Sequence, residues 1–280
     1  QPGAAVPLPH SASARLMRLL ALLLCVLALP VQAQLRVVSL APSLSEIMLE
    51  LQAAELLVGV LDGGERPAAL RHLPSVGHFD QLELETLLQL QPDLVLLWPD
   101  SISAAQRQQL QGLNIPVLVV EPRKLADLAE QFVEIAVRIE RPEQGRRLQA
   151  QFNQGLQRLR QRYQRESPLR AFYQVWNVPL YTIGGQQIIS DALTVCGASN
   201  IFAEQRLPAP QVSVESVLER NPEVILGGSG AELEHWQNWP QLPAVRLGQV
   251  WTVPDKGLER PSFQMLGALE KLCEQLHQAR

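Results

Sequence analysis

The sequence has little of what several large classes of protein require. Charged residues make up 19% of its 280 residues, and 28 acidic against 24 basic side chains give a formal net charge of −4. No broad basic surface is therefore available to hold a nucleic-acid backbone. The sequence also lacks the G-x-S-x-G, phosphate-loop, H-E-x-x-H and G-x-G-x-x-G signatures, which excludes the enzyme classes that depend on them. We expect no catalytic residues and no bound nucleic acid.

Long apolar runs are scarce as well. Residues 19–29 form an apolar run of 11 residues, well short of the ~20 that a membrane-spanning helix needs. Arg15 and Arg18 precede this run, and the small-residue ending V-Q-A follows it at positions 31–33. The arrangement predicts a signal peptide within residues 1–33, with an upstream extension before Met17 and cleavage before Gln34. We expect an exported protein that is not embedded in the membrane.

Cysteine is rare. Cys25 falls in the predicted signal peptide, so only Cys196 and Cys273 remain after cleavage. An even pair in an exported chain favours a disulfide over two free thiols. Zinc needs more ligands than these two, and His72 and His78 lack the spacing of ligands on one helix. We expect a disulfide and no metal site.

The remaining chain, rich in apolar residues, alternates strands and helices. A short β-branched run occupies residues 35–40, and apolar runs of strand length occupy residues 56–61, 94–98 and 115–120. Strands of this kind, with helices between them, predict a parallel sheet covered on both faces. Ser43 and Glu46 follow the first strand with the spacing of a capping box, which predicts the start of a helix at Ser43.

Two segments of the sequence resemble each other, and this internal echo favours two similar lobes. The segment LETLLQLQPDLVL at residues 84–96 is matched 130 positions later by VESVLERNPEVIL at residues 214–226. Both segments predict a short helix, a turn with proline and an acidic residue, and a buried strand. Coincidence is the alternative, because helix, turn and strand follow one another in any α/β protein.

Between the two matched segments, one long helix is expected. Pro142 suits the first turn of a helix, and the apolar residues after it fall on a single helical stripe. A helix of this length resists hinge bending, so the lobes should move little. We predict residues 34–141 as an N-terminal α/β lobe, 142–166 as the linker helix and 167–280 as a C-terminal α/β lobe. The stripe consists of Leu148, Phe152, Leu156, Leu159 and Tyr163.

Aromatic residues make up only 5% of the chain, and many fall on predicted loops. Trp98 ends an apolar strand, where the ligands of α/β proteins tend to bind. Core packing is the alternative for any single tryptophan. A cleft walled by aromatic rings with few charges suits a large, partly apolar ligand better than a sugar or an amino acid. The aromatic residues on predicted loops are Phe79, Trp98, Tyr173, Trp176, Tyr181, Trp236, Trp239 and Trp251.

Five segments together resemble a known family. They are RVVSLAPS at 36–43, the block at 84–98, VCGASNIF at 195–202, PQVSVE at 210–215 and the pair Glu259-Arg260. In this order, from about residue 35 to the C-terminus, the chain resembles the periplasmic cobalamin-binding proteins of ABC importers. Those proteins are class III, or helical-backbone, substrate-binding proteins.

The resemblance implies an α/β fold of two Rossmann-like lobes with parallel sheets, joined by a single long rigid helix. Cobalamin or a related corrinoid would be bound in the cleft between the lobes as a transported ligand and not as a cofactor. The resemblance also implies that Cys196 and Cys273 are bonded to each other. It assigns four residues to the cleft: Phe79, Trp98, Tyr181 and Arg260.

The same resemblance implies a periplasmic protein without enzymatic activity, whose partner is the permease dimer of an ABC transporter with its ATPase subunits. In the family, one surface glutamate of each lobe docks onto arginines of the permease. Glu85 and Glu215 match these two residues, and the internal echo independently places them at equivalent points of the two halves.

Two departures from the family pattern leave the ligand open. Gly63 and Ala209 stand where aromatic residues are expected in the cleft, which implies a roomier or differently shaped site. Haem or a ferric siderophore therefore remain alternatives, although haem calls for an axial Tyr or His and a siderophore for several Arg. The alternative from another class is a secreted enzyme with an unrecognised site.

Overall fold

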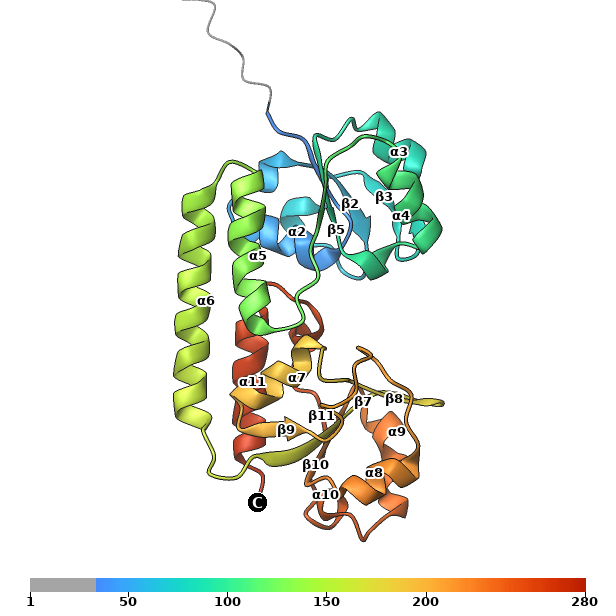
Figure 1. Cartoon of the computed structure of the whole chain (residues 1–280), viewed down its shortest axis with the longest axis vertical. Helices are drawn as coiled ribbons and strands as arrows, with labels where there is room; N and C mark the ends of the chain where they lie inside the picture. The colour runs from blue at the N-terminus through green and yellow to red at the C-terminus, as the bar shows by residue number, and fades with distance from the viewer. Residues whose placement is uncertain (1–33) are drawn as a thin grey trace, which may run out of the picture. The chain divides into compact units, whose positions relative to one another are not determined.

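Two α/β lobes follow one another along the chain, with the long helix α6 between them (Figure 1). The structure is a computed structural model and describes residues 34–280; the predicted signal peptide lies outside the described residues. The strands are β1 (Val37–Ser39), β2 (Leu57–Asp62), β3 (Ser75–His78), β4 (Gln81–Leu82), β5 (Leu94–Leu97), β6 (Val117–Val119), β7 (Leu169–Asn177), β8 (Leu180–Thr182), β9 (Ala198–Asn200), β10 (Val224–Gly227) and β11 (Val250–Thr252). The helices are α2 (Pro42–Glu50), α3 (Leu84–Gln89), α4 (Ala104–Gln111), α5 (Leu125–Arg138), α6 (Pro142–Tyr163), α7 (Ile188–Val195), α8 (Val214–Arg220), α9 (Gly230–Leu233), α10 (Pro243–Arg246) and α11 (Met265–His277).

Each lobe is built on a predominantly parallel sheet, as the sequence predicts. The N-terminal sheet has the order β4-β3-β2-β1-β5-β6, and only β4 runs antiparallel to its neighbour. The C-terminal sheet has the order β11-β10-β7-β8, with β9 also paired to β7 and with β8 antiparallel. The parallel strands share one arrangement: β2-β1-β5-β6 in the first lobe corresponds to β9-β7-β10-β11 in the second. The predicted α/β fold of two lobes is confirmed.

The two matched segments also make equivalent hydrogen bonds. The backbone N–H of Arg36 donates to Asp93 Oδ2 over 2.8 Å, and the N–H of Asp93 donates back to the Arg36 carbonyl over 2.8 Å. In the second lobe, the N–H of Arg170 donates to Glu223 Oε2 over 2.9 Å, and the N–H of Glu223 donates to the Arg170 carbonyl over 2.8 Å. The acidic residue after each Pro therefore ties the strand that follows the short helix to the first strand of its own sheet.

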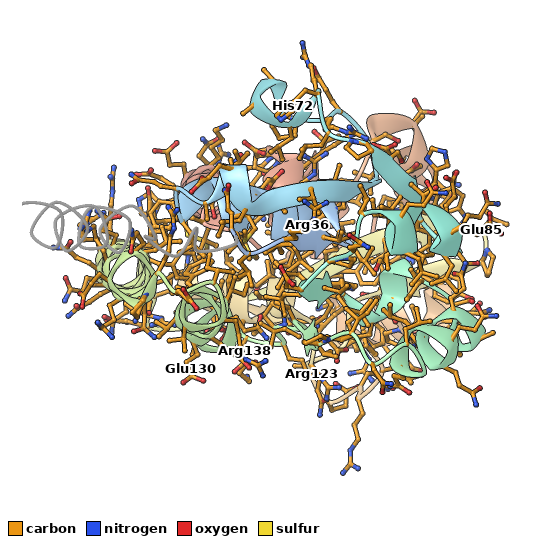
Figure 2. All side chains as sticks on the ribbon, turned by 90° about the horizontal axis from the view of Figure 1, so that it is seen from above. Arg36, His72, Glu85, Arg123, Glu130 and Arg138 are labelled. Atoms are coloured by element: carbon orange, nitrogen blue, oxygen red, sulfur yellow. A yellow bond between two sulfur atoms is a disulfide. The ribbon has the colours of Figure 1, made fainter. Side chains whose placement is uncertain are left out.

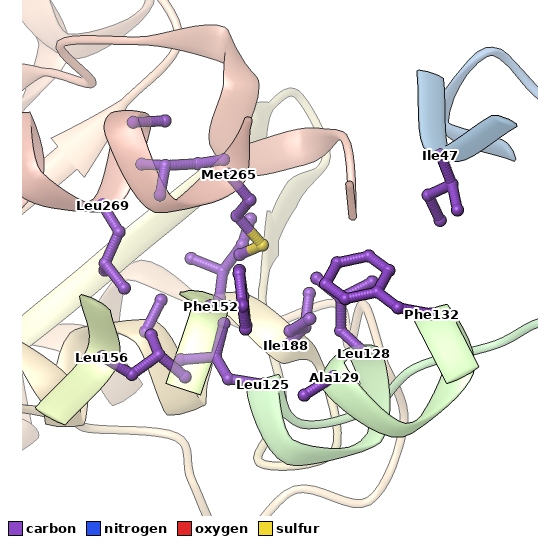
Figure 3. Packing of buried hydrophobic residues seen from close by; sticks show 14 of the residues in the cluster. Ile47, Leu125, Leu128, Ala129, Phe132, Phe152, Leu156, Ile188, Met265 and Leu269 are labelled. Atoms are coloured by element: carbon purple, nitrogen blue, oxygen red, sulfur yellow. The ribbon is translucent and has the colours of Figure 1, made fainter. Parts of the chain in front are cut away.

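A helical brace joins the two lobes. Helix α5 packs along α6, and α11 packs against α6 as well. All five residues of the predicted stripe on α6 are buried, and one hydrophobic core extends from β1 through the brace to α11. Figure 3 shows Phe132 of α5, Phe152 of α6 and Met265 of α11 within this core. The linker helix is therefore supported on its apolar face by two others.

Two expectations from the sequence are wrong in detail. Helix α2 begins at Pro42 with Ala41 as its N-cap and without a side-chain cap, so Ser43 and Glu46 form no capping box. Proline already fixes the backbone for the first helical turn, which leaves the Glu46 side chain available for other contacts. Several aromatic residues expected on loops lie elsewhere: Tyr173 belongs to β7 and is buried, and Trp236 is fully buried in the core.

No helix among the described residues is both long enough and apolar enough to cross a membrane.

Candidate functional site

A cavity of about 350 Å³ lies where the N-terminal lobe meets a segment of the C-terminal lobe. A volume of this order is typical of small-molecule sites. Its N-terminal walls follow the carboxyl ends of β1, β2, β3 and β5, which is the edge of an open α/β sheet where ligands bind. Its C-terminal wall is the 3₁₀ helix η5 (Lys256–Glu259) and the residues after it. The lining residues are Ala41, Pro42, Ser43, Gly63, Phe79, Trp98, Ser101, Lys256, Glu259, Arg260 and Pro261.

Two aromatic side chains of the N-terminal lobe line the cavity. Trp98 directly follows β5, is half-buried, and packs against the core. Phe79 lies in the turn after β3 and is 67% exposed. Ser101 ties these two turns together, because its carbonyl accepts the N–H of Asp80 over 2.9 Å while its hydroxyl donates to the Trp98 carbonyl over 2.6 Å. The two backbone turns that carry these rings are thus tied to each other.

Arg260 also lines the cavity, and residues of the N-terminal lobe hold its guanidinium group. Its Nη1 donates to Glu46 Oε1 over 3.1 Å. Its Nη2 lies so close to Gly64, which has a φ of +95°, that a Cβ at position 64 would be 3.3 Å away. The guanidinium group is therefore positioned by a carboxylate of α2 and by the close approach of a glycine loop.

Tyr181 lies apart from this cavity. It is half-buried on β8, opposite Trp176 of β7 in the antiparallel ladder, and it is not among the lining residues. The cavity thus brings Phe79, Trp98 and Arg260 together, whereas Tyr181 lies on the β7–β8 hairpin. Gly63 does line the cavity, and a Cβ at that position would meet Pro42 Cγ at 2.8 Å. This loop therefore has no room for an aromatic side chain unless Pro42 moves.

Some lining residues were not identified from the sequence as site residues. Ser101 and Lys256 carried no signal beyond their positions after a strand or within a loop. Glu259 was visible only as the neighbour of Arg260. Glu46 had a signal, its spacing from Ser43, but helix capping accounted for that spacing equally well.

Two further groups near this junction, the Glu50 carboxyl and the Tyr173 hydroxyl, have shifted pKa values. Burial raises the pKa of Glu50 to about 7, although the backbone N–H groups of Phe263 and Gln264 act in the opposite direction. Burial also raises the pKa of the Tyr173 hydroxyl, and the nearby Glu259 carboxylate adds to that effect. Tyr173 is therefore a neutral group at physiological pH.

Glu85 and Glu215 occupy equivalent positions in the first turns of α3 and α8, and both are exposed. Figure 2 shows Glu85 at the surface of the N-terminal lobe, away from Glu130 and Arg138 of α5. The pKa of Glu215 is lowered by its own backbone N–H and by the Ser213 hydroxyl. The equivalent placement agrees with the internal echo, since each helix precedes the strand that pairs with the first strand of its sheet.

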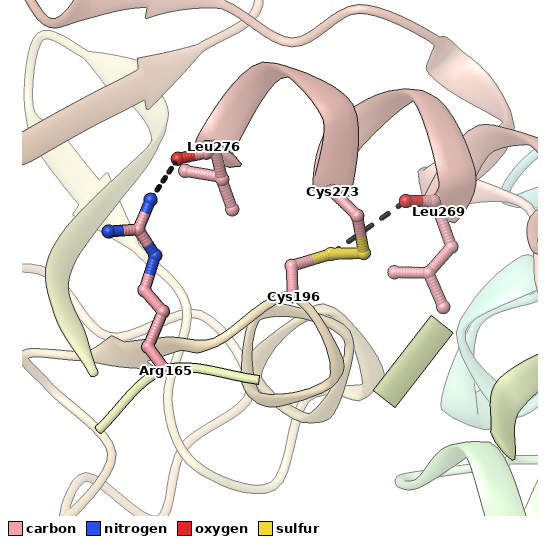
Figure 4. The surroundings of a disulfide bond; sticks show 5 residues. All are labelled: Arg165, Cys196, Leu269, Cys273 and Leu276. Carbon is pink, nitrogen blue, oxygen red and sulfur yellow. Dashed lines mark hydrogen bonds between the residues drawn. A yellow bond between two sulfur atoms is a disulfide. The ribbon is translucent and has the colours of Figure 1, made fainter. Parts of the chain in front are cut away.

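The two cysteines of the described chain form a disulfide. Cys196 caps the C-terminal end of α7 and is bonded to Cys273 of α11 (Figure 4). Nearby, Arg165 Nη2 donates to the Leu276 carbonyl over 2.8 Å, which also fastens α11. Across residues 34–280, no group of three or more His, Cys, Asp or Glu side chains is placed to hold a metal ion.

Comparisons with known proteins agree with this architecture. The sequence profile of the periplasmic binding protein family matches residues 37–256. The vitamin B12-binding protein of Yersinia pestis strain Pestoides F is 34% identical over 275 residues, which cover 96% of this chain and 94% of that protein. The corresponding protein of Vibrio campbellii is 31% identical over 248 residues, 88% of this chain and 90% of its own length.

A solved structure is similar as well. The crystal structure of the periplasmic vitamin B12 binding protein BtuF of Vibrio cholerae matches with a TM-score of 0.78 and 31% identity, and covers 88% of this chain and 98% of its own. The resemblance seen in the sequence is thereby confirmed. The chain belongs to the periplasmic binding protein family.

Proposed function

We propose that this protein captures cobalamin in the cavity between its lobes and delivers it to the permease of an ABC importer. The observation that carries the proposal is the cavity itself, which Phe79 and Trp98 of the N-terminal lobe line together with Arg260 of the C-terminal lobe. It lies in a chain that is 34% identical, over 96% of its length, to a vitamin B12-binding protein.

The chemistry of the cavity suits a corrinoid. An aromatic residue as exposed as Phe79, at 67%, leaves apolar surface that a large ring can cover. Arg260 supplies hydrogen-bond donors to carbonyl groups on the rim of the ring. A corrinoid is larger than about 350 Å³, so part of the ligand would extend beyond the cavity towards the exposed Phe79.

Titration of the purified chain 34–280 with cyanocobalamin tests the proposal. Visible absorbance follows the corrin, and a parallel titration with haemin separates the two ring systems by their spectra. We expect saturable binding of one cyanocobalamin per protein and weaker binding of haemin. Saturable haemin binding without cyanocobalamin binding would refute the corrinoid assignment while leaving a transport role.

We further propose that Glu85 and Glu215 dock the protein onto its permease. Their equivalent, exposed positions place one acidic side chain on each lobe. A dimeric partner that presents one arginine site per subunit would require this arrangement. The double variant Glu85→Ala, Glu215→Ala should keep ligand binding and lose uptake. The matched control is Glu83→Ala, Glu219→Ala, which removes one exposed glutamate beside each site. Normal uptake by the first variant would show that these carboxylates only stabilise helix termini.

The periplasm is the proposed location, and the lobe boundaries at 34–141, 142–166 and 167–280 are part of the same proposal. N-terminal sequencing of the exported protein should begin at Gln34. Limited proteolysis should leave the 142–166 segment uncut because α6 is packed along its apolar face. A mature protein that starts elsewhere would shift the predicted cleavage site.

A further inference from the structure

The Glu46 carboxylate lies almost fully buried behind the wall of the cavity. Its side chain is 5% exposed, whereas the Arg260 side chain keeps 42% of its surface exposed. Both carboxylate oxygens are used, because Oε1 accepts from Arg260 Nη1 over 3.1 Å and Oε2 accepts from the Ser262 hydroxyl over 2.9 Å. A buried carboxylate is costly unless it is paired in this way. The position of Arg260 is therefore tied to Glu46.

This pair changes what the cavity can recognise. Arg260 keeps N–H donors on its exposed side, but Glu46 compensates its charge. The other two charged lining residues, Lys256 and Glu259, have opposite signs. The cavity therefore offers hydrogen-bond donors without a net positive charge. These donors suit neutral carbonyl acceptors, for example carboxamides. Carboxylates bind most strongly to a cation whose charge is not compensated, and the cavity does not offer one.

We infer that Glu46 determines ligand specificity: by holding and neutralising Arg260, it makes the cavity select ligands with neutral carbonyl acceptors over anionic ligands of the same shape. Glu46 acts through Arg260 and is a positioning residue. The inference rests on the proposed function, because it concerns the ligand of the same cavity.

Glu50 provides a matched control on the same helix. It lies one turn after Glu46 and accepts the backbone N–H groups of Phe263 over 2.9 Å and Gln264 over 3.2 Å. Both glutamates thus fasten α2 to the same segment of the C-terminal lobe. Of the two, Glu46 is the one bonded to a side chain that lines the cavity, so Glu50→Gln loosens the junction without removing the carboxylate that compensates Arg260.

The test compares two probes that differ in one group. They are cyanocobalamin and its monocarboxylic acid, in which one propionamide is hydrolysed, and dissociation constants are measured by equilibrium dialysis at pH 8 and low salt. The wild-type protein should prefer cyanocobalamin. Glu46→Gln should shift the ratio of the two constants towards the acid by about tenfold, because one compensating charge is removed. High salt should reduce this shift, and Glu50→Gln should leave the ratio unchanged.

A double-mutant cycle shows whether Glu46 acts through Arg260. Arg260→Gln alone leaves Glu46 uncompensated and should shift the ratio against the acid, so the inference stays testable even where Glu46→Gln folds poorly. The double variant Arg260→Gln, Glu46→Gln again has no net charge at this pair, so its ratio should return to near the wild-type value and should not reach the preference for the acid that Glu46→Gln shows beside Arg260. An unchanged ratio in Glu46→Gln, or an equal shift in Glu50→Gln, would overturn the inference.

Failure of the proposed function has a different signature. If the wild-type protein binds neither probe, the cobalamin assignment is wrong, and haemin with its anionic propionates becomes the probe. Glu46→Gln must then bind haemin more tightly than the wild-type protein does. Equal haemin affinity in that case would overturn the specificity role of Glu46 as well.

Discussion

Helices α2 and α7 occupy equivalent places in the two lobes, yet they hold the end of the chain in different ways. Helix α2 lies between β1 and the parallel strand β2, and α7, which follows the β7–β8 hairpin, precedes β9, the strand parallel to β7. Helix α2 fastens residues 260–264 through the carboxylates of Glu46 and Glu50. Helix α7 fastens α11 through the disulfide between Cys196 and Cys273.

The disulfide is a covalent connection, whereas the contacts of the two carboxylates can change with pH. The disulfide joins two helices on the C-terminal side of the molecule and does not respond to pH. The carboxylates cross between the lobes at the edge of the cavity, where one of them contacts a lining residue. The connection is thus covalent away from the cavity and electrostatic beside it.

Removal of the disulfide should have the largest effect on stability. The bond joins residues 77 positions apart, and closing a loop of that length stabilises the folded state by about 4 kcal/mol in the chain-entropy account. The double variant Cys196→Ala, Cys273→Ala should lose a comparable free energy of unfolding in urea. Ligand affinity should change little, because the bond lies away from the cavity. A loss below about 1 kcal/mol would show that α11 is held mainly by packing.

Titration of Glu50 should have the next largest effect. Its pKa rises from 4.5 in the unfolded chain to about 7 in the folded protein, so the folded state binds the proton more tightly. The contribution of Glu50 to stability is therefore complete below pH 4.5 and is lost as the pH rises towards 7. At ~1.4 kcal/mol per unit, the loss is at most about 3 kcal/mol.

The measurement is the free energy of unfolding at about pH 5 and about pH 7.5. Glu50→Gln should show a weaker fall over this interval than the wild-type protein, since the variant has no proton to lose at this site. The exposed Glu219→Gln serves as control and should retain the wild-type slope. Parallel slopes in all three proteins would contradict the raised pKa of Glu50.

Arg36 and Arg170 make similar side-chain hydrogen bonds in the two lobes. Arg36 donates to the Leu90 carbonyl through Nε over 2.9 Å and Nη2 over 2.7 Å, and Arg170 donates to the Asn221 carbonyl through Nε over 3.0 Å. Arg36→Ala and Arg170→Ala should each destabilise the protein by ~1 kcal/mol, with Arg36→Ala the more costly. The exposed Arg71→Ala is the control. A large loss of unfolding free energy in only one of the two variants would show that similar hydrogen bonds contribute unequally to stability in the two lobes.

The scaffold was predictable from the sequence because its signals are local. Continuous apolar strands, the stripe on α6 and the Pro-acid turns each follow from neighbouring residues, and the echo needed only two segments of one sequence. The capping box at Ser43 and Glu46 was wrong for the same reason. Capping is a local rule, and the partners that Glu46 contacts, Arg260 and Ser262, lie more than two hundred positions away.

The site was predictable only in part. Trp98 could be placed from its position at a strand end, whereas Phe79 and Arg260 came from the resemblance to a family. Ser101 and Lys256 line the cavity because separate loops converge there, and no single segment records that convergence. Tyr181 shows the opposite case, since the resemblance assigned it to the cleft while the structure places it on the β7–β8 hairpin outside this cavity.

Tyr181 and Trp98 give the last and smallest comparison, between the aromatic walls of the two lobes. An aromatic face stacked on a ligand ring contributes ~0.5 to 1.5 kcal/mol beyond the burial of area. Trp98→Ala should therefore weaken cyanocobalamin binding several-fold by calorimetry, and Tyr181→Ala should have a smaller effect because its ring lies outside the cavity. Trp251→Ala, at a half-buried tryptophan of β11 outside the cavity lining, controls for the loss of a large side chain. An equal or greater loss in Tyr181→Ala would mean that the hairpin closes over the bound ligand, so that the two lobes contribute walls of equal weight.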